Sequence, residues 1–535
     1  MTAAGAPAAP RRPVNKWLVT VSVTFGTLMG AIDASIVNVA IPQLRGSLGA
    51  TVEEITWVTT AFVIATVIVM PLTAFLGRLF GQKRVYLFAL GLFVFGSALC
   101  GMAHSLGLMI AARIVQGLGA GALQPTEQAI LRQTFPPEEQ GMASAVFGMA
   151  VVLGPAFGPT LGGWLIDNYS WPWIFYINLP VGALALLMVS RFVHEPEDIR
   201  AANQKAAAAQ RNNIDWSGII LLTVCLAATQ YVLEEGARND WFESRLITVC
   251  ALVSIITLFT FISRELTAPL PVVDLSLFKD SVFASGTVIG SIMFAMLMTQ
   301  TFLLPLFMQE MLGFTATQSG LALMPRSLAM MFAMPIVGRL YNKVSPRIFI
   351  SAGIVLFSIS AYQMSHYTLD TTARTVMSVL VLQGFAFACL FIPLTTVALA
   401  SIPRLKMADA TGLNSLLRQI GGSVGLAIFA SLISRYATQA RYGLVAHLYP
   451  GRPELVNQMS MMQQTLVQHG LPPGAAAQVA QGTLFGSVMR QSMVLSFEKL
   501  FLLAGICFLC VLPLVLVMRS SSKTSGPAAD VHVEV

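Results

Sequence analysis

Long apolar stretches alternate with short polar segments along nearly the whole chain. An apolar stretch of about 20 residues crosses about 30 Å of hydrocarbon as an α-helix, which satisfies its own backbone polar groups. The first stretch is too long for a cleaved signal peptide and no small-residue cleavage site follows it, so we expect it to remain a span. Fourteen spans are predicted, at residues 17–41, 52–76, 84–103, 107–131, 140–166, 173–193, 216–234, 245–263, 282–308, 317–340, 347–366, 375–400, 408–435 and 493–518.

The composition supports a chain that lies mostly in a membrane. Of the 535 residues, 55% are apolar and 11% are charged, and the mean hydropathy is +0.72. Soluble globular domains carry about 25% charged residues, so both a water-soluble enzyme and a disordered scaffold are excluded. We therefore predict an all-α membrane protein with 14 transmembrane helices.

Basic residues are distributed unevenly between the two sides of this arrangement. If the N-terminus is cytoplasmic, 21 of the 32 Lys and Arg residues lie in inner segments and nine in outer ones, five of them in or beside one long loop. This bias follows the positive-inside rule and predicts that both termini are cytoplasmic. The net charge of +7 includes no basic run long enough to indicate a nucleic-acid partner.

Sequence motifs for catalysis, metal binding and nucleotide binding are absent from the chain. It has no GxxxxGK[ST], no HExxH and no serine nucleophile elbow, so we expect no catalytic residue, no cofactor, no metal site and no ATP-driven motor. The six cysteines lie in apolar stretches, and the CxxC of Cys507 and Cys510 has no second pair or nearby His, which favours a buried structural role. An ion gradient is then the expected energy source.

The spans are grouped into two sets of six with two spans between them. The segments 70–88 and 334–350 resemble each other and occupy equivalent connections when Pro71 is aligned with Pro335, which indicates duplicated halves of the kind found in transporters. The predicted organisation is a cytoplasmic tail (1–16), an N-terminal six-helix bundle (17–193), a cytoplasmic linker (194–215), two additional spans (216–263), a C-terminal six-helix bundle (282–518) with an outer loop (436–491), and a disordered cytoplasmic tail (519–535).

The outer loop 436–491 is long and polar, and it contains four prolines. Between the prolines, ELVNQMSMMQQTLVQHG and PGAAAQVAQGTLFGSVMRQ are predicted to be helical. The loop is either a packed extramembrane hairpin or a docking surface for a periplasmic partner, and the residues favour neither alternative.

Six strings are notable for their order and spacing along the chain: AIDASIVNVAIP (31–42), LMIAARIVQGLGAGAL (108–123), LGPAFGPTLGGWL (153–165), WPWIFYINLPVG (171–182), GLALMPRS (320–327) and LNSLLRQIGGSVGLAI (413–428). Together they resemble the fourteen-span drug:proton antiporters of the major facilitator superfamily (EmrB/QacA type). The resemblance covers about residues 17–518 and implies a major facilitator fold, proton-coupled export of hydrophobic or amphipathic compounds, and a bacterial inner-membrane location. It also implies a periplasmic adaptor and an outer-membrane channel as partners, because 436–491 resembles the EmrB-like loop in length and in VMRQSMVLSFEKLF.

One position departs from the superfamily pattern. The loop after the second span usually carries an Asp, whereas this chain has Arg78 there, and Asn342 in the second copy. An Asp-centred charge relay between the halves is therefore not expected. EmrB-like members often lack that Asp, so the departure indicates the subgroup.

Four charged residues are predicted to lie at membrane depth, where each costs at least about 2.5–3.5 kcal/mol and therefore indicates a function. They are Asp33, Arg113, Glu127 and Arg326. Asp33 lies about eight residues before the outer end of its span and Arg113 about six residues after the outer start of its span, so the two are expected at similar depth. Burial favours the protonated acid and the neighbouring cation favours the carboxylate, which predicts that Asp33 couples protons or recognises cations; a fixed structural ion pair is the alternative.

Glu127, which follows Pro125, is either a second protonation site, together with Asp33 and Arg113, or a solvated interface carboxylate. Arg326 is expected either to hold the structure through backbone carbonyls or to pair with a substrate anion. The residues expected to line a substrate cavity are Asn38, Gln116, Gln124, Gln128 and Arg326.

The fifth span has a mechanical pattern. Gly154, Gly158 and Gly162 recur every four residues and leave a face on which another backbone can approach closely, while Pro155 and Pro159 interrupt the helix. A gating helix is favoured over a generic packing face. The residues expected to form the gate or antiporter motif are Gly154, Pro155, Gly158, Pro159, Gly162, Gly163, Asn414, Arg418 and Gln419.

The sequence thus predicts a proton-coupled multidrug efflux transporter working by alternating access. The alternatives are a specific metabolite exporter or uptake carrier of the same fold, and an assembly component of an envelope-spanning efflux complex.

Overall fold

The computed structural model describes residues 15–210, 214–449 and 451–517, which are built from helices and contain no strand. Fourteen helices in this part of the chain are long and apolar enough to cross a membrane, so the predicted number of spans is confirmed and the chain is a multi-pass membrane protein. The predicted tails, 1–16 and 519–535, lie almost wholly outside the described residues.

The helices that form or extend the spans are α1 (Lys16–Leu48), α2 (Val52–Ile55), α3 (Trp57–Phe80), α4 (Gln82–Gly101), α5 (Leu106–Thr134), η1 (Pro137–Glu139), α6 (Gln140–Asn168), α7 (Trp173–Tyr176), α8 (Asn178–Phe192), α10 (Trp216–Glu235), α11 (Arg245–Thr267), α12 (Ser281–Leu306), η4 (Phe307–Met311), α13 (Ala316–Leu340), α14 (Pro346–Met364), α15 (Ala373–Ala398), η5 (Arg404–Lys406), α16 (Met407–Ala446), α18 (Pro473–Leu509) and α19 (Leu512–Val517). The remaining helices are α9 (Glu197–Gln210), which lies in the predicted linker and packs against α3, η2 (Trp241–Glu243), η3 (Leu275–Lys279) and α17 (Pro453–Gln468).

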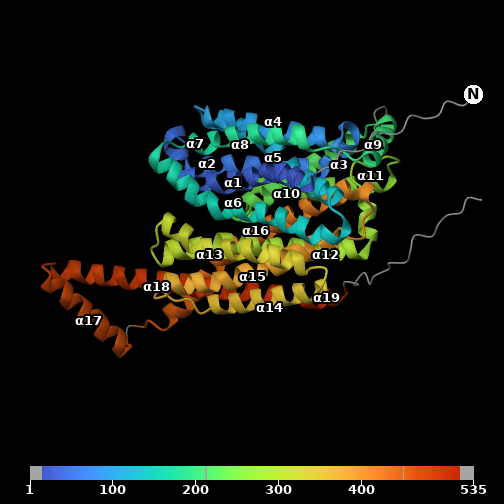
Figure 1. The fold of residues 1–535 in the computed structure, drawn as a ribbon. Coiled ribbons are helices and arrows are strands. Elements are labelled where there is room, and N and C mark those ends of the chain that lie inside the picture. Colours follow the sequence, from blue (N-terminus) through green and yellow to red (C-terminus); the bar gives the residue numbers. More distant parts are fainter. Residues whose placement is uncertain (1–14, 211–213, 450, 518–535) are drawn as a thin grey trace, which may run out of the picture.

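The long helices are arranged in two layers, each built from six spans. Helices α1 to α8 form one layer and α12 to α18 the other, with α6 and α13 packed together where the layers meet (Figure 1). We call these layers the N-half and the C-half. Helices α10 and α11 pack against each other as a hairpin, and α10 contacts both α3 of the N-half and α16 of the C-half.

Local sequence explains where helices begin and end and why some of them pack closely. Helix α1 begins where the side chain of Asn15 accepts a hydrogen bond from the backbone N–H of Trp17, and ends at Gly49, whose φ of 63° a side chain would disfavour. Helices α4 and α5 approach closely because Gly119 stands against the backbone of Phe93, where an added Cβ would lie 2.5 Å from the Phe93 nitrogen.

The two halves are joined by polar contacts at one end of the bundle. We call the end at which α1 begins the near end and the opposite end the far end. Five contacts between the halves lie at the near end: Arg78 pairs with Asp409, Arg132 Nη2 donates to the Thr395 carbonyl at 2.7 Å, Thr396 Oγ1 to Ser144 Oγ at 2.9 Å, Arg404 Nη2 to the Gln133 carbonyl at 2.6 Å, and Asn342 to the Glu138 carbonyl. This near-end seam closes the bundle on that side.

At the far end the inserted hairpin links the halves. Glu235 of α10 accepts a hydrogen bond from Thr60 of α3 at 3.1 Å, while Gln230 donates to Ser423 of α16 at 2.7 Å. After α10, the indole N–H of Trp241 donates to Ser431 of α16 at 2.8 Å. The hairpin is thus held by both halves.

The predicted outer loop 436–491 is largely helical. Helix α16 continues to Ala446, eleven residues beyond the predicted end of its span, and α18 already begins at Pro473. Helix α17 lies between them and packs on α18, and it buries none of its residues. Figure 1 shows α17 and the start of α18 projecting from the far end, opposite the labelled N-terminus. The structure therefore has a projecting helical hairpin, here defined as residues 437–491.

Candidate transport site

A buried ionic cluster occupies the middle of the N-half. Arg113 Nη1 of α5 lies 2.6 Å from Asp33 Oδ2 of α1, and the two side chains are 1% and 0% exposed. The second carboxylate oxygen of Asp33 accepts hydrogen bonds from Gln116 Nε2 at 2.8 Å and Asn178 Nδ2 at 3.1 Å. The contact predicted between Asp33 and Arg113 is confirmed.

The partners of Asp33 are themselves held in place. Ser97 Oγ accepts from both Gln116 and Asn178, at 3.2 and 2.9 Å. Arg113 also donates to the Val58 carbonyl at 3.0 Å, and its guanidinium lies 4.0 Å from the centre of the Phe62 ring. Replacing the Asp33 carboxylate by a neutral group would leave Arg113 buried without an ion-pair partner. Five helices, α1, α3, α4, α5 and α8, supply these groups.

Glu127 is a second buried carboxylate and lies nearer the near end of α5. Its Oε1 accepts a hydrogen bond from Thr24 of α1 at 3.0 Å, and its Oε2 has no hydrogen-bond partner. The side chain is fully buried and forms no ion pair with any residue that the structure describes. Its burial is inconsistent with a solvated interface carboxylate.

The other residues expected in the cavity are not gathered into one open space. Gln116 is fully buried within the Asp33 cluster. Gln128 is also buried and its Oε1 has no partner, whereas Gln124 is half-buried. Asn38 is exposed on α1 and donates only a weak bond to the Ala34 carbonyl at 3.4 Å.

The glycine face of α6 contacts α1 within the N-half. A Cβ added to Gly154 would lie 2.3 Å from the carbonyl carbon of Ala31, and one added to Gly162 would lie 2.6 Å from Ile36. At Gly158 the neighbour is Ser35, whose hydroxyl donates to the Gly154 carbonyl at 2.9 Å. Gly163 has open space beside it. The predicted close backbone approach is confirmed, and its partner is α1.

Helix α6 also contacts the C-half. Pro155 and Pro159 lie inside α6, which remains helical through both of them. Gly320 of α13 faces Pro159, and near the beginning of α6 Gly141 stands against the Gly338 carbonyl. Helix α6 therefore joins a rigid contact with α1 to a contact across the layers.

The arginines of the C-half lie in a different environment from Arg113. Arg326 of α13 is buried and donates to Thr301 Oγ1 at 3.2 Å, while its Nη1 has no partner. Arg418 of α16 is also buried, and Gln419 beside it is half-buried. Neither arginine forms an ion pair with a residue that the structure describes.

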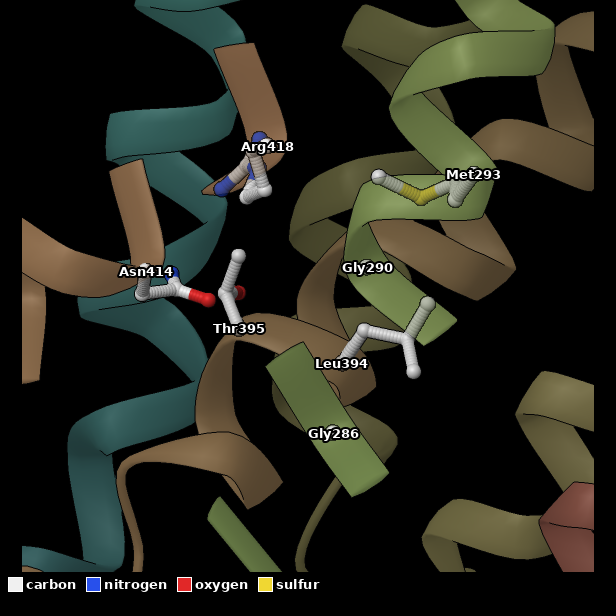
Figure 2. Close-up of a pocket in the computed structure, with 7 residues that line it drawn as sticks. All are labelled: Gly286, Gly290, Met293, Leu394, Thr395, Asn414 and Arg418. Carbon is white, nitrogen blue, oxygen red and sulfur yellow. The ribbon is translucent and has the colours of Figure 1, made fainter. Parts of the chain in front are cut away.

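A narrow pocket, without room for a water molecule in this state, lies beside Arg418 inside the C-half. Figure 2 shows Arg418 and Asn414 of α16 facing Thr395, with Met293 and Leu394 on the other side. Gly286 and Gly290 of α12 complete the lining and leave room for these side chains. The sequence assigned Asn414 and Arg418 to a gate, whereas the structure places both on the wall of this pocket.

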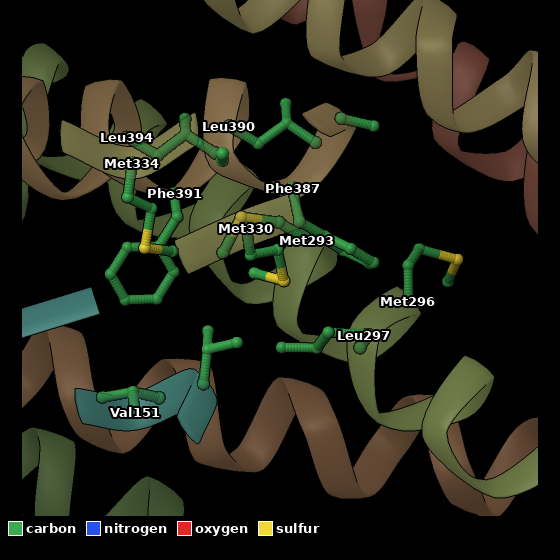
Figure 3. Close-up of a cluster of buried hydrophobic side chains, with 14 of the residues drawn as sticks. Val151, Met293, Met296, Leu297, Met330, Met334, Phe387, Leu390, Phe391 and Leu394 are labelled. Carbon is green, nitrogen blue, oxygen red and sulfur yellow. The ribbon is translucent and has the colours of Figure 1, made fainter. Parts of the chain in front are cut away.

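A cluster of methionine and phenylalanine side chains continues from the pocket toward the N-half. Met293, Met330 and Met334 lie beside Phe387 and Phe391, and Val151 of α6 faces them across the boundary between the layers (Figure 3). Flexible, polarisable methionines of this kind adapt to ligands of varied shape. The cluster thus gives the C-half an apolar surface at the boundary between the two layers.

Three residues important to these sites were not singled out from the sequence. Asn178 and Ser97 complete the Asp33 cluster, and Asn178 belongs to the string WPWIFYINLPVG, which offered a signal. Asp409 pairs with Arg78 across the halves. The position where an Asp is usual thus carries the opposite charge and still forms an ion pair, with an acid contributed by the other half.

Comparisons with known proteins agree with this architecture. The sequence profile of the Major Facilitator Superfamily matches residues 23–426. The multidrug export protein EmrB of Haemophilus influenzae is 34% identical over 498 residues, which cover 92% of this chain and 94% of that protein. The fatty acid resistance protein FarB of Neisseria gonorrhoeae is 32% identical, over 95% of this chain and 97% of its own. The human organic anion transporter MFSD10 shares the fold, with a TM-score of 0.60 at 15% identity over 93% of this chain and all of its own.

Proposed function

The chain belongs to the Major Facilitator Superfamily, and on that premise we propose that it is a proton-coupled efflux transporter for hydrophobic or amphipathic compounds. The observation that carries the proposal is the buried Asp33–Arg113 pair, because a charge pair at membrane depth is costly and marks an ion or substrate pathway. Export-protein relatives that are similar over nearly their whole length support the same function.

Asp33 is the proton-coupling acid in this proposal, with Arg113 as its counter-ion and Glu127 as a second proton site. Glu127 has one oxygen without a hydrogen-bond partner and no ion pair among the described residues, whereas Asp33 is paired with Arg113. A proton that reaches Glu127 from the near end and Asp33 from the far end would follow α5 through the N-half.

Alternating access is proposed to arise from movement of the N-half against the C-half. In the proposed cycle, substrate leaves toward the far end while the near-end seam is closed, and the hydrogen bonds of that seam support this step. Helix α6 is the proposed gating element, since its glycines pack it on α1 and other residues along it meet α13. Asn38, Gln124, Gln128 and Arg326 are the proposed cavity residues outside the cluster.

The near end is proposed to face the cytoplasm of a bacterial cell, across its inner membrane. The basic residues of the inner segments support this orientation through the positive-inside rule. Both termini then lie in the cytoplasm, and the projecting helical hairpin lies in the periplasm.

Export is tested with the purified protein in proteoliposomes carrying an imposed pH gradient. A fluorescent amphipathic dye is expected to accumulate against its gradient only while the pH gradient lasts, and an uncoupler is expected to stop it. Dye movement that ignores both the gradient and the uncoupler would contradict proton coupling.

A second candidate function, assembly with a periplasmic adaptor and an outer-membrane channel, is favoured by the projecting hairpin. Its helix α17 buries no residue, and Val456 and Met461 on it are exposed apolar side chains. Replacing 447–472 by a short Gly/Ser linker, which leaves the transmembrane parts of α16 and α18 intact, is expected to preserve transport in proteoliposomes and abolish drug resistance of whole cells. Retained resistance would argue against docking, and lost vesicle transport would show that the hairpin serves the transport step itself.

A further inference from the structure

Arg418 is a buried cation without an anionic partner among the described residues. Its side chain is 7% exposed, and its guanidinium is held between two rings, 4.7 Å from the centre of Phe391 and 5.4 Å from that of Phe294. It makes no hydrogen bond or ion pair with any residue in the described part of the chain. An arginine does not give up its proton in proteins, so its charge persists through the transport cycle and calls for a counter-ion.

Asn414 places a second donor at the same pocket. It lies one helical turn before Arg418 on α16, so the two side chains share a face. Asn414 is 2% exposed, and its Nδ2 has no hydrogen-bond partner. Figure 2 shows both side chains on the wall of the pocket, beside Thr395. A buried donor without an acceptor is costly, and here it stands beside an unpaired positive charge.

The neighbouring acids at the near end of the C-half are already engaged. Asp409 pairs with Arg78, and Asp274 pairs with Lys406 at 2.6 Å. Asp280 accepts the backbone N–H groups at the start of α12. None of these carboxylates reaches Arg418, so the protein's described residues do not supply the missing anion.

The rest of the pocket indicates what the anion is attached to. Met293 and Leu394 line the pocket, and both also belong to the methionine and phenylalanine cluster of Figure 3. A ligand that places a planar anion on Arg418 and Asn414 therefore meets an apolar surface with the remainder of its body. This combination describes an amphipathic organic acid.

We propose that Arg418 and Asn414 bind the carboxylate of amphipathic organic anions and give the transporter its selectivity for them. The proposal rests on the proposed transport function and names one class of its substrates. Thr395 of the pocket wall accepts the hydrogen bond from Arg132 in the near-end seam. Separation of the halves at that end therefore uncovers the pocket, and anions bind from the near side. This role replaces the gate that the sequence indicated for these two residues.

The test is equilibrium dialysis of labelled probes against the full-length protein in lipid nanodiscs. The probes are 2-naphthoate and its neutral isostere 2-naphthamide, which differ in charge and share one apolar body. The wild-type protein is expected to bind 2-naphthoate at least tenfold more tightly, a difference of about 1.4 kcal/mol. Equal affinity of the wild-type protein for both probes would overturn the proposal.

Variants assign the preference to residues. Arg418→Gln is expected to lower the affinity for 2-naphthoate about tenfold or more and to leave 2-naphthamide binding unchanged, while Asn414→Leu gives a smaller loss of the same kind. Arg490→Gln is the matched control, because Arg490 is an arginine of the same half that donates to the Met311 carbonyl at the far end. An equal loss for both probes in Arg418→Gln would indicate a structural role and overturn the proposal.

Two further measurements keep the result decisive. Arg418→Lys preserves the charge without the planar fork and is expected to retain part of the preference; it replaces Arg418→Gln if that variant does not fold, as judged by melting temperature. Proton-driven transport of a cationic dye by the wild-type protein is measured in parallel in proteoliposomes. If the wild-type protein transports no dye, the proposed function fails; if it transports dye and lacks the naphthoate preference, only the anion site fails.

Discussion

Replacing Asp33 by Asn separates a proton-coupling acid from a structural ion pair. Asparagine has nearly the same volume, so the perturbation is the loss of one buried negative charge. Arg113 keeps only neutral contacts in this variant: the Val58 carbonyl at 3.0 Å, Gln116 Oε1 at 2.6 Å and the Phe62 ring at 4.0 Å.

The cost follows from the burial of the pair. Removing one partner of a buried ion pair costs about 3–5 kcal/mol, because the other charge stays buried and uncompensated. The three neutral contacts of Arg113 offset part of this cost, so we expect Asp33→Asn to lose about 2–4 kcal/mol of stability. The double variant Asp33→Asn/Arg113→Gln removes both charges and is expected to recover most of the loss, since replacing a whole buried pair is often neutral.

Transport assays distinguish a proton-coupling acid from a structural ion pair, which stability measurements alone do not. Substrate-driven proton movement is measured in proteoliposomes with a pH-sensitive dye, and substrate counterflow is measured without a gradient. A coupling acid predicts that the single and double variants both lose proton movement, while the stable double variant keeps counterflow. Proton movement restored in the double variant would refute the reasoning, because the pair would then be structural.

Two further predictions concern packing and the seam. Gly154→Ala places a methyl group against the Ala31 backbone and is expected to lower the free energy of unfolding by about 1–3 kcal/mol and to impair transport. The matched control Gly163→Ala has open space and is expected to change the stability by no more than about 0.5 kcal/mol. Equal effects of the two variants in thermal unfolding would show that the glycine face does not set the helix spacing. Arg78→Asp and Asp409→Arg are each expected to lower the stability, and the double variant, which restores an ion pair, is expected to recover part of it, with a coupling energy of about 0.5–3 kcal/mol in a double-mutant cycle. Additive losses would mean that the pair does not hold the near end closed.

The sequence predicted the spans and one site because both follow from the cost of polarity in hydrocarbon. Each of the fourteen predicted spans corresponds to a long helix, since apolar length decides whether a helix crosses the membrane. Asp33 and Arg113 were expected to meet because similar depth on two helices of one half leaves few other partners.

Contacts between distant segments were beyond the sequence for an equally physical reason. Asp409 begins a span 331 residues after Arg78, and hydropathy carries no information on which helix ends meet. Ser97, whose hydroxyl accepts hydrogen bonds from Gln116 and Asn178 in the Asp33 cluster, is a small residue that looks like any other serine in a span. The ends of α16 and α18 were also missed, because a helix that leaves the membrane loses its apolar pattern while its backbone continues.

The continuous helices α16 and α18 connect the transmembrane part of the C-half rigidly to the hairpin outside the membrane. Helix α16 has 40 residues and α18 has 37, so at about 1.5 Å per residue each is about 55–60 Å long. About 30 Å of that length lies in hydrocarbon, and about 25 Å remains to carry α17. A 10° rotation of the C-half therefore moves the tip of the hairpin by about 4 Å, on the order of a helical turn. A protein bound to that tip would sense each transport cycle as a mechanical stroke, with no separate signal passing between them.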